Sequence, residues 1–191
     1  MNKSENIALF DMDGTLCDYD KSLSEGLERL CSPQEPVYQL PIKDDSPGYI
    51  KNRADLIKAQ ESWWENLPRY QLGWDILEVA KNLNYKIMIL TQGPKRNPAS
   101  WSGKKKWIDN NLGQDIDVTI TRDKGLVYGK VLVDDFPDYL SRWLQWRKRG
   151  LAIMPANELN KHFVHPQLIR YDGSNLDEVA SAMERLKSSI G

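Results

Sequence analysis

The stretch Ile7–Thr15, IALFDMDGT in one-letter code, decides the fold class. Its first four residues are apolar without alternation, which is typical of a strand covered on both faces in a parallel sheet. Two carboxylates, Asp11 and Asp13, follow directly, and Gly14 then allows a sharp turn. Because ligands of open α/β sheets bind beyond the carboxyl ends of the strands, we expect chemistry in this loop.

Residues two apart in an extended segment project to the same side, so Asp11 and Asp13 are expected to lie close together. Two neighbouring carboxylates favour a cation, and a hard divalent ion such as Mg²⁺ prefers oxygen ligands. An ordinary Asp-Gly turn that ends a strand is the alternative interpretation.

Two further apolar runs end in polar residues in the same way. Ile87–Leu90 is followed by Thr91, and Val131–Val133 is followed by Asp134 and Asp135. Each of these polar residues alone could be a helix N-cap. Three strand ends that carry Asp, Thr and Asp together are poorly explained by chance. The remaining strands are expected at Val118–Ile120, Leu151–Met154 and Leu168–Tyr171.

The segments between most strands have helical spacing, which predicts a doubly wound α/β domain with a parallel sheet. Residues 18–72 break this rhythm, because they are too many for a single crossover helix. The spacing of the leucines early in this interval predicts one amphipathic helix, and residues 49–66 predict another. We therefore expect a small helical cap, residues 18–72, inserted after the first strand of a core formed by residues 1–17 and 73–191.

The composition excludes several classes of protein. The 191 residues include 27 acidic and 26 basic side chains, so the net charge of −1 argues against a protein built mainly to bind nucleic acid or an anionic membrane. No apolar run approaches the roughly 20 residues that span a bilayer, and no signal peptide is expected. Two cysteines cannot form a disulfide framework, which favours a cytoplasmic location with free thiols.

Taken together, the motifs resemble those of the haloacid dehalogenase superfamily, most of whose members are Mg²⁺-dependent phosphohydrolases. The shared features are Asp-x-Asp-Gly-Thr after the first strand, a strand-end Thr, a Lys and a strand-end Asp-Asp pair. The resemblance is closer still to the 5'(3')-deoxyribonucleotidases, and a further set of residues carries it: Tyr19, Lys104–Trp107, Thr121–Lys124 and Asp134–Asp138.

The resemblance implies covalent catalysis. Asp11 would be the nucleophile that forms an aspartyl-phosphate, and Asp13 would be the general acid and then the general base. Mg²⁺ would be held by Asp11, the backbone carbonyl of Asp13 and one acid of the later pair. Asp135 is favoured as that ligand, with Asp134 as its support. The ion would neutralise charge during phosphoryl transfer.

The resemblance also implies a phosphate-binding loop and a lysine. Thr91 would hydrogen-bond the phosphate. The next residue, Gln92, departs from the Ser that these nucleotidases tend to carry. The phosphate lysine stays open between Lys124, on the loop after the third core strand, and Lys104, on the apolar face of an expected helix.

Substrate choice is expected to depend on the cap. Tyr19 and Trp64 are candidates to stack on a nucleobase, because aromatic faces accept any base. The alternative is that these rings simply pack within the protein.

The sequence thus predicts a Mg²⁺-dependent phosphomonoester hydrolase whose substrate is a nucleoside monophosphate, with a deoxynucleotide as the first choice. Alternatives are a phosphatase for nucleic-acid 3' ends, another small-molecule phosphatase of the same superfamily, and a phosphate- or nucleotide-binding protein without turnover. No membrane or nucleic-acid partner is expected. The oligomeric state stays open, with a homodimer as one option.

Overall fold

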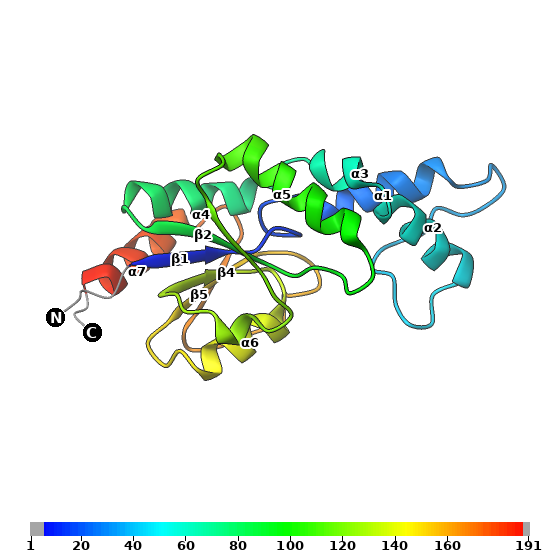
Figure 1. Ribbon diagram of the computed structural model, residues 1–191. Coiled ribbons are helices and arrows are strands. Elements are labelled where there is room, and N and C mark those ends of the chain that lie inside the picture. The colour runs from blue at the N-terminus through cyan, green and yellow to red at the C-terminus, as the bar shows by residue number, and fades with distance from the viewer. Residues whose placement is uncertain (1–5, 189–191) are drawn as a thin grey trace. The chain divides into compact units, whose positions relative to one another are not determined.

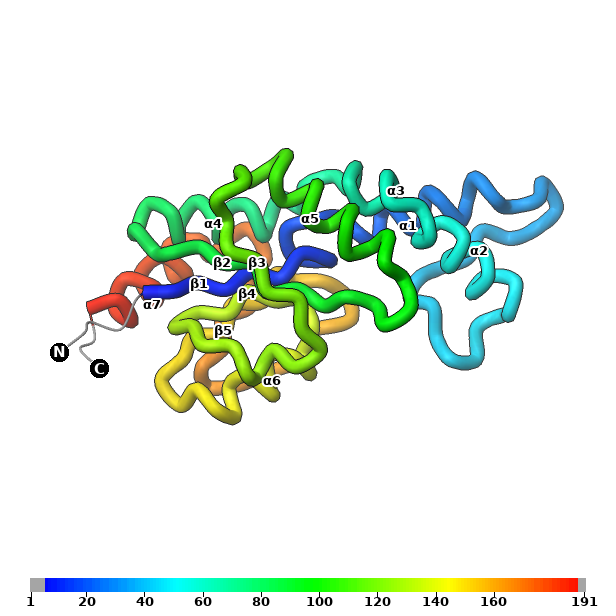
Figure 2. The backbone as a smooth tube through the Cα atoms, in the orientation of Figure 1, coloured from blue at the N-terminus to red at the C-terminus, as the bar shows by residue number. Residues whose placement is uncertain are grey.

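The computed structural model describes residues 6–188, which form two compact units. The first, which we call the sheet unit, contains the residues up to Cys17, Arg69–Gln92 and the residues from Ile116 onward. The second, the helical unit, contains Asp18–Pro68 and Gly93–Asp115. Figure 2 follows the chain as it passes from one unit to the other and back.

The sheet unit is built on six parallel strands in the order β3-β2-β1-β4-β5-β6. This confirms the predicted doubly wound parallel sheet, and each expected strand is present to within one residue at either end. β1 lies in the middle because its run of apolar residues can be covered on both faces. The strands are β1 (Ile7–Phe10), β2 (Lys86–Thr91), β3 (Asp117–Ile120), β4 (Val131–Val133), β5 (Leu151–Pro155) and β6 (Leu168–Tyr171).

Three helices cover this sheet. Figure 1 shows α4 (Gln71–Asn82) and α7 (Leu176–Ser188) on one face and α6 (Pro137–Gln145) on the other. Each presents an apolar stripe to the strands. On α6 this stripe includes Trp143, which is fully buried against a cluster with Leu9 and other strand residues. The two faces of the sheet are therefore both closed, as its unbroken apolar strands require.

The helical unit contains α1 (Tyr19–Arg29), α2 (Gly48–Lys58), α3 (Glu61–Glu65) and α5 (Pro98–Leu112). Its core is apolar and lies between α1 and α2, with Leu23, Leu27, Ile50, Ala54 and Ile57 as its buried members. No helix of residues 6–188 is long and apolar enough to span a bilayer.

The single helix expected over residues 49–66 is instead two helices, α2 and α3. The carbonyl of Lys58, which a continuing helix would bond to the backbone, accepts hydrogen bonds from two side chains. Trp64 Nε1 donates to it at 2.8 Å and Asn97 Nδ2 at 2.7 Å. These side-chain donors satisfy the end of α2 and allow the chain to turn.

The sequence assigned residues 93–115 to the core, but in the structure they group with the insert, which ends at Pro68 rather than at residue 72. The reason is close packing of α5 on α3. At Gly103, a Cβ would collide with the Glu61 carbonyl and with Trp64. Trp107 is fully buried, and its Nε1 donates to the Leu67 carbonyl at 2.7 Å. These contacts depend on pairings distant in sequence that helical spacing does not reveal.

Candidate active site

The candidate site begins where two neighbouring strands of the sheet unit end. β1 and β4 are hydrogen-bonded neighbours with Phe10 opposite Val133, so Asp11 and Asp134 leave the sheet side by side. The Asp11 N–H donates to the Val133 carbonyl at 2.9 Å, which holds the two strand ends together. Carboxylate oxygens of Asp11, Asp134 and Asp135 all lie within 4.8 Å of one another. We call these three residues the acid cluster.

Lys124 supplies the positive charge of this site. It begins the short 3₁₀ turn Lys124–Leu126, and its side chain is 1% exposed. Its Nζ lies 2.8 Å from Asp11 Oδ1 and 2.6 Å from Asp134 Oδ2. The ammonium also lies 4.6 Å from the centre of the Tyr139 ring, a favourable cation–π distance. Of the two lysines that the sequence left open, Lys124 is therefore the one paired with the acid cluster.

The turn that carries Lys124 is fixed by its own side chains. Thr121 Oγ1 accepts the N–H of Asp123 at 3.1 Å, and Asp123 Oδ1 accepts the N–H of Gly125 at 3.1 Å. Asp123 Oδ2 in turn pairs with the guanidinium of Arg142 at 2.6 Å, which ties the turn to α6. The stretch 121–124 thus forms a turn held by side-chain hydrogen bonds, from which Lys124 points to the acid cluster.

Asp134 and Asp135 are held differently. Asp134 accepts hydrogen bonds from Lys124 on one oxygen and from the Phe136 N–H, at 2.9 Å, on the other. Asp135 accepts from two side chains at longer distances, from Thr15 Oγ1 at 3.4 Å and from Asn157 Nδ2 at 3.3 Å. The Asp135 carboxylate is thus the more available of the two as a cation ligand.

The space around Asp135 requires glycine at position 14. Gly14 has a φ of +72°, and a Cβ there would collide with the Asp135 carboxylate. The loop after β1 closes tightly, because the Met12 carbonyl accepts the N–H groups of Thr15, Leu16 and Cys17. Asp13 lies in this loop, half-buried.

The charges of the site do not balance. Three clustered carboxylates and one ammonium leave a formal charge of −2 in a buried setting. Burial raises the pKa of Asp134 to about 7, against the opposing effect of Lys124. Burial, followed by the charges of Asp134 and Asp11, raises the pKa of Asp135 well above its ordinary value. Burial also opposes the charge on Lys124, but Asp11 and Asp134 outweigh it and raise the pKa of this lysine.

A divalent cation would correct this imbalance. The donors are hard carboxylate oxygens, the ligands that Mg²⁺ and Ca²⁺ prefer, and they converge within bonding reach of one ion. The residues of the acid cluster therefore fit a divalent metal.

The expected phosphate-binding residues end the neighbouring strand. Thr91 is the last residue of β2, on the other side of β1, and is fully buried. Its carbonyl accepts the N–H of Thr121 at 3.0 Å, which links the end of β2 to the stretch that carries Lys124. Gln92 follows it and is half-buried.

The other predicted substrate residues lie together in the helical unit. The Tyr19 ring lies 5.4 Å from Trp63, edge to face, and 5.8 Å from Trp64. Lys104 is buried, and its Nζ lies 5.2 Å from the centre of the Trp64 ring. We call Tyr19, Trp63 and Trp64 the aromatic cluster.

Sequence reasoning missed several residues that touch the acid cluster or Lys124. Thr15 contacts Asp135, and the Tyr139 ring contacts Lys124. The two asparagines of the segment after β5, Asn157 and Asn160, both bond to Asp135. The sequence could have indicated these asparagines. They follow the carboxyl end of a predicted strand, and the same position singled out the other site residues.

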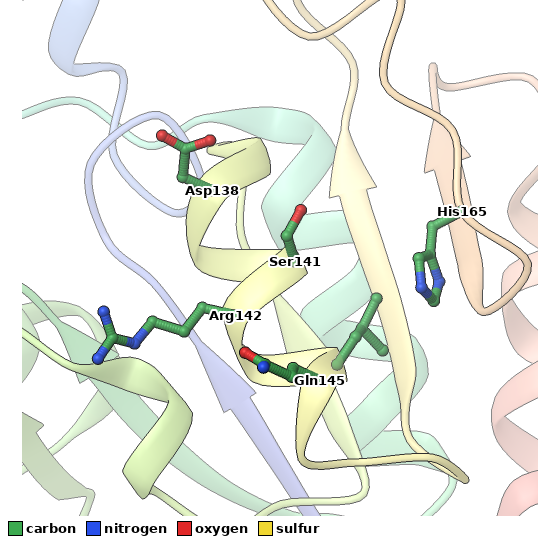
Figure 3. Close-up of a pocket in the computed structure, with 6 residues that line it drawn as sticks. Asp138, Ser141, Arg142, Gln145 and His165 are labelled. Carbon is green, nitrogen blue, oxygen red and sulfur yellow. The ribbon is translucent and has the colours of Figure 1, made fainter.

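A separate hollow lies beside α6 and contains none of the predicted site residues. Asp138, Ser141, Arg142, Gln145 and His165 line it. In Figure 3, Arg142 extends to one side of α6 while His165 lies on the other. The Nδ1 of His165 accepts the N–H of Gln167 at 3.1 Å, so this histidine supports its own loop.

The chain is similar in sequence to known proteins. No protein-family model matches the chain. Two curated relatives, each named as a candidate 5'(3')-deoxyribonucleotidase, come from Bordetella pertussis and Bordetella bronchiseptica. They are 24% and 23% identical over 138 residues, which is 69% of this chain and 74% of each relative.

Solved structures show the fold more clearly than the two curated relatives do. A candidate haloacid dehalogenase-like hydrolase from Burkholderia xenovorans LB400 superposes with a TM-score of 0.52 at 15% identity, over 94% of this chain and 99% of that one. A haloacid dehalogenase-like family hydrolase from Xanthomonas campestris gives 0.52 at 10% identity, over 98% and 94%. The chain has the haloacid dehalogenase-like fold. The resemblance seen in the sequence motifs is thereby confirmed at the level of the fold, and the acid cluster lies at the strand ends where this fold was expected to carry its chemistry.

Proposed function

We propose that this protein is a Mg²⁺-dependent phosphomonoester hydrolase that acts through an aspartyl-phosphate on Asp11. The observation that carries the proposal is the buried arrangement at the ends of β1 and β4. One carboxylate, Asp11, is paired with a fully buried lysine and lies beside two further acids that fit a divalent ion. A purely structural ion pair needs one partner and not this excess of buried negative charge.

In the first step, an oxygen of the Asp11 carboxylate attacks phosphorus and forms a new P–O bond. The ester P–O bond breaks, and the leaving alkoxide takes a proton from Asp13. The charge of Lys124 lies next to Asp11, where it lowers the repulsion between this carboxylate and an anionic phosphate.

In the second step, water attacks the phosphorus of the aspartyl-phosphate. Asp13, now ionised, accepts a proton from this water, and the P–O bond to Asp11 breaks. Inorganic phosphate leaves, and both aspartates return to their starting forms. Bound Mg²⁺ would be held by Asp11, the backbone carbonyl of Asp13 and Asp135, and it would neutralise the charge of the transferring group.

For the substrate, we propose a nucleoside monophosphate, with deoxynucleotides first. Tyr19 and Trp63 of the aromatic cluster support this choice, because both are half-buried and such rings can stack on a nucleobase, whereas Trp64 is 2% exposed and packs within the helical unit. The names of the two Bordetella relatives agree with it. In this proposal Thr91 and Gln92 contact the phosphate, and Lys104 is a further substrate-binding candidate.

The test is phosphate release, with and without Mg²⁺, from ribo- and deoxynucleoside 5'- and 3'-monophosphates and from an aryl phosphate. Asp11→Asn serves as the blank. Mg²⁺-dependent release confined to deoxynucleotides would support the whole proposal. Release from the aryl phosphate alone would retain the chemistry and reject the nucleotide.

Asp13→Asn separates an enzyme from a binding protein. Loss of the acid and base should lower turnover by about 10²–10⁴-fold, while the binding of a nucleotide should change little. Equal phosphate release by this variant and the wild type would contradict the assigned role of Asp13.

A further inference from the structure

Two asparagines after β5 form a hydrogen-bonded unit against Asp135. Asn157 Nδ2 donates to Asp135 Oδ2 at 3.3 Å, and Asn160 Nδ2 donates to the Asp135 backbone carbonyl at 3.0 Å. The segment between them is closed by Asn157 Oδ1, which accepts the N–H groups of Leu159 and Asn160, both at 2.9 Å. One short turn therefore contacts both the side chain and the backbone of an acid-cluster residue.

Hydrogen bonds to β5 and β6 hold this turn in place. Asn160 is 1% exposed, and its amide also donates to the Pro155 carbonyl at 2.8 Å. Its oxygen accepts from the Asn157 N–H at 3.0 Å and from Arg170 Nε at 3.2 Å. Arg170, on the neighbouring strand β6, donates a second bond to the Asn157 carbonyl at 3.0 Å. The position of Asn157 is thus fixed by the sheet itself.

We propose that Asn157 is a positioning residue for Asp135, whose side-chain amide sets the affinity of the acid cluster for a divalent cation. This inference rests on the proposed function, in which Asp135 is a metal ligand. Asn157 holds one oxygen of the Asp135 carboxylate and Thr15 holds the other, at 3.3 and 3.4 Å. Donors on both oxygens restrict the rotation of the carboxylate about its last bond.

The chemistry favours asparagine for this task. Its amide is neutral, so it can orient a carboxylate without adding to the charge of the site or taking the place of the cation. The same residue offers an oxygen that closes its own turn. Removal of a residue that hydrogen-bonds to a metal ligand commonly lowers the metal affinity by about 10- to 100-fold.

A structural role and a positioning role can be separated by Asn157→Ser. The hydroxyl of serine can still accept a backbone N–H and close the turn, but it is too short to replace the amide that reaches Asp135. Asn157 is half-buried, so the variant should fold. Asn175→Ser is the matched control, because Asn175 follows the end of β6 as Asn157 follows the end of β5, and its side chain hydrogen-bonds to Arg170, Asp172 and Glu178.

The experiment is calorimetric titration of the three proteins with MgCl₂ in the absence of substrate. We expect Asn157→Ser to bind Mg²⁺ at least about tenfold more weakly, and Asn175→Ser to bind as the wild type does. The Mg²⁺ concentration that gives half-maximal phosphatase activity should rise in the same proportion. At saturating Mg²⁺, the KM for an aryl phosphate should stay unchanged.

Three outcomes would overturn the inference. Equal Mg²⁺ affinity of the wild type and Asn157→Ser would reject it while leaving the proposed function intact. Equal weakening in both variants would assign the effect to a general loss of stability and would reject a specific role of Asn157. A wild type that binds no Mg²⁺ would remove the inference together with the proposed metal site.

Discussion

The two units of this protein hold their candidate functional residues in different ways. In the sheet unit, the acid cluster and Lys124 are joined by short charged contacts between buried groups that leave the ends of fixed strands. In the helical unit, the aromatic cluster is held by ring contacts of 4.9 to 5.8 Å and by one hydrogen bond from Trp64. A short charged contact between buried groups is lost when either partner is replaced, whereas packed rings tolerate a substitution more readily. We therefore expect changes in the first unit to remove chemistry and changes in the second to alter substrate preference.

The largest effect is expected for Asp11→Asn. Removal of a nucleophile should lower phosphate release by more than about 10⁴-fold. The fold should be retained, because the change removes one of three crowded negative charges. Phosphate release and thermal unfolding, measured on the same preparation, test both statements. Turnover at the wild-type rate would rule out the aspartyl-phosphate.

Lys124→Met should affect both stability and activity. It leaves the acid cluster without its buried ammonium, which should cost about 3–5 kcal/mol in the free energy of unfolding at neutral pH. Loss of the positive charge should lower kcat by about 10²–10³-fold. Urea unfolding in the absence of Mg²⁺ measures the first effect.

A second variant checks that charge is the cause. Lys124→Met combined with Asp134→Asn removes one charge of each sign, and it should recover part of the lost stability. If the double variant is less stable than Lys124→Met alone, the balance of charge does not explain the loss.

In the helical unit, Tyr19→Ala should act on binding alone. The loss of one stacking ring is worth about 1–3 kcal/mol, so the KM for a nucleotide should rise by about tenfold, with the KM for an aryl phosphate nearly unchanged. Trp101→Ala is the control, because this ring lies on α5 in the same unit and is 45% exposed. Equal effects on both substrates would reject stacking of the base.

The smallest effect concerns an ion pair of the helical unit. Arg53 Nη1 lies 2.6 Å from Glu35 Oε1, and this hydrogen bond lowers the pKa of Glu35 below its ordinary value of 4.5. A carboxyl with a lowered pKa stabilises the fold above its ordinary pKa, and this contribution is lost as the pH falls through the lowered value. Glu35→Gln should thus be slightly less stable than the wild type at pH 7, and the gap should close below pH 4.5. A gap that widens on acidification would contradict this sign.

The parts of the fold that follow from local pattern were predictable, and those that depend on distant pairings were not. The unbroken apolar runs revealed the six strands, and the strand ends indicated Asp11, Asp134 and Asp135, whose carboxylates lie together in the structure. Helical spacing indicated that helices lie between most of the strands. It could not show that α5 packs on α3, because this packing depends on the close approach of Gly103 to Glu61 and Trp64, which are distant from it in the sequence.

The same limit applies to the site. The sequence offered two lysines of similar merit, and the choice between them depends on which one lies next to Asp11 in three dimensions. The hydrogen bonds of Asn157 and Asn160 to Asp135 join residues more than 20 positions apart. The strand-end rule would have singled out these asparagines had it been applied to β5 as it was to β1, β2 and β4.

The central place of β1 has a consequence for how the molecule is made. Ala8 pairs with Ile87 on one side and with Val131 on the other, so β1 receives its second neighbour only after the more than 100 residues between Ala8 and Val131 have been made. Asp11 therefore meets Asp134 late, and a nascent chain that stops before β4 carries the nucleophile without its partners. Such a fragment exposes an open apolar edge, which favours chaperone binding over premature chemistry.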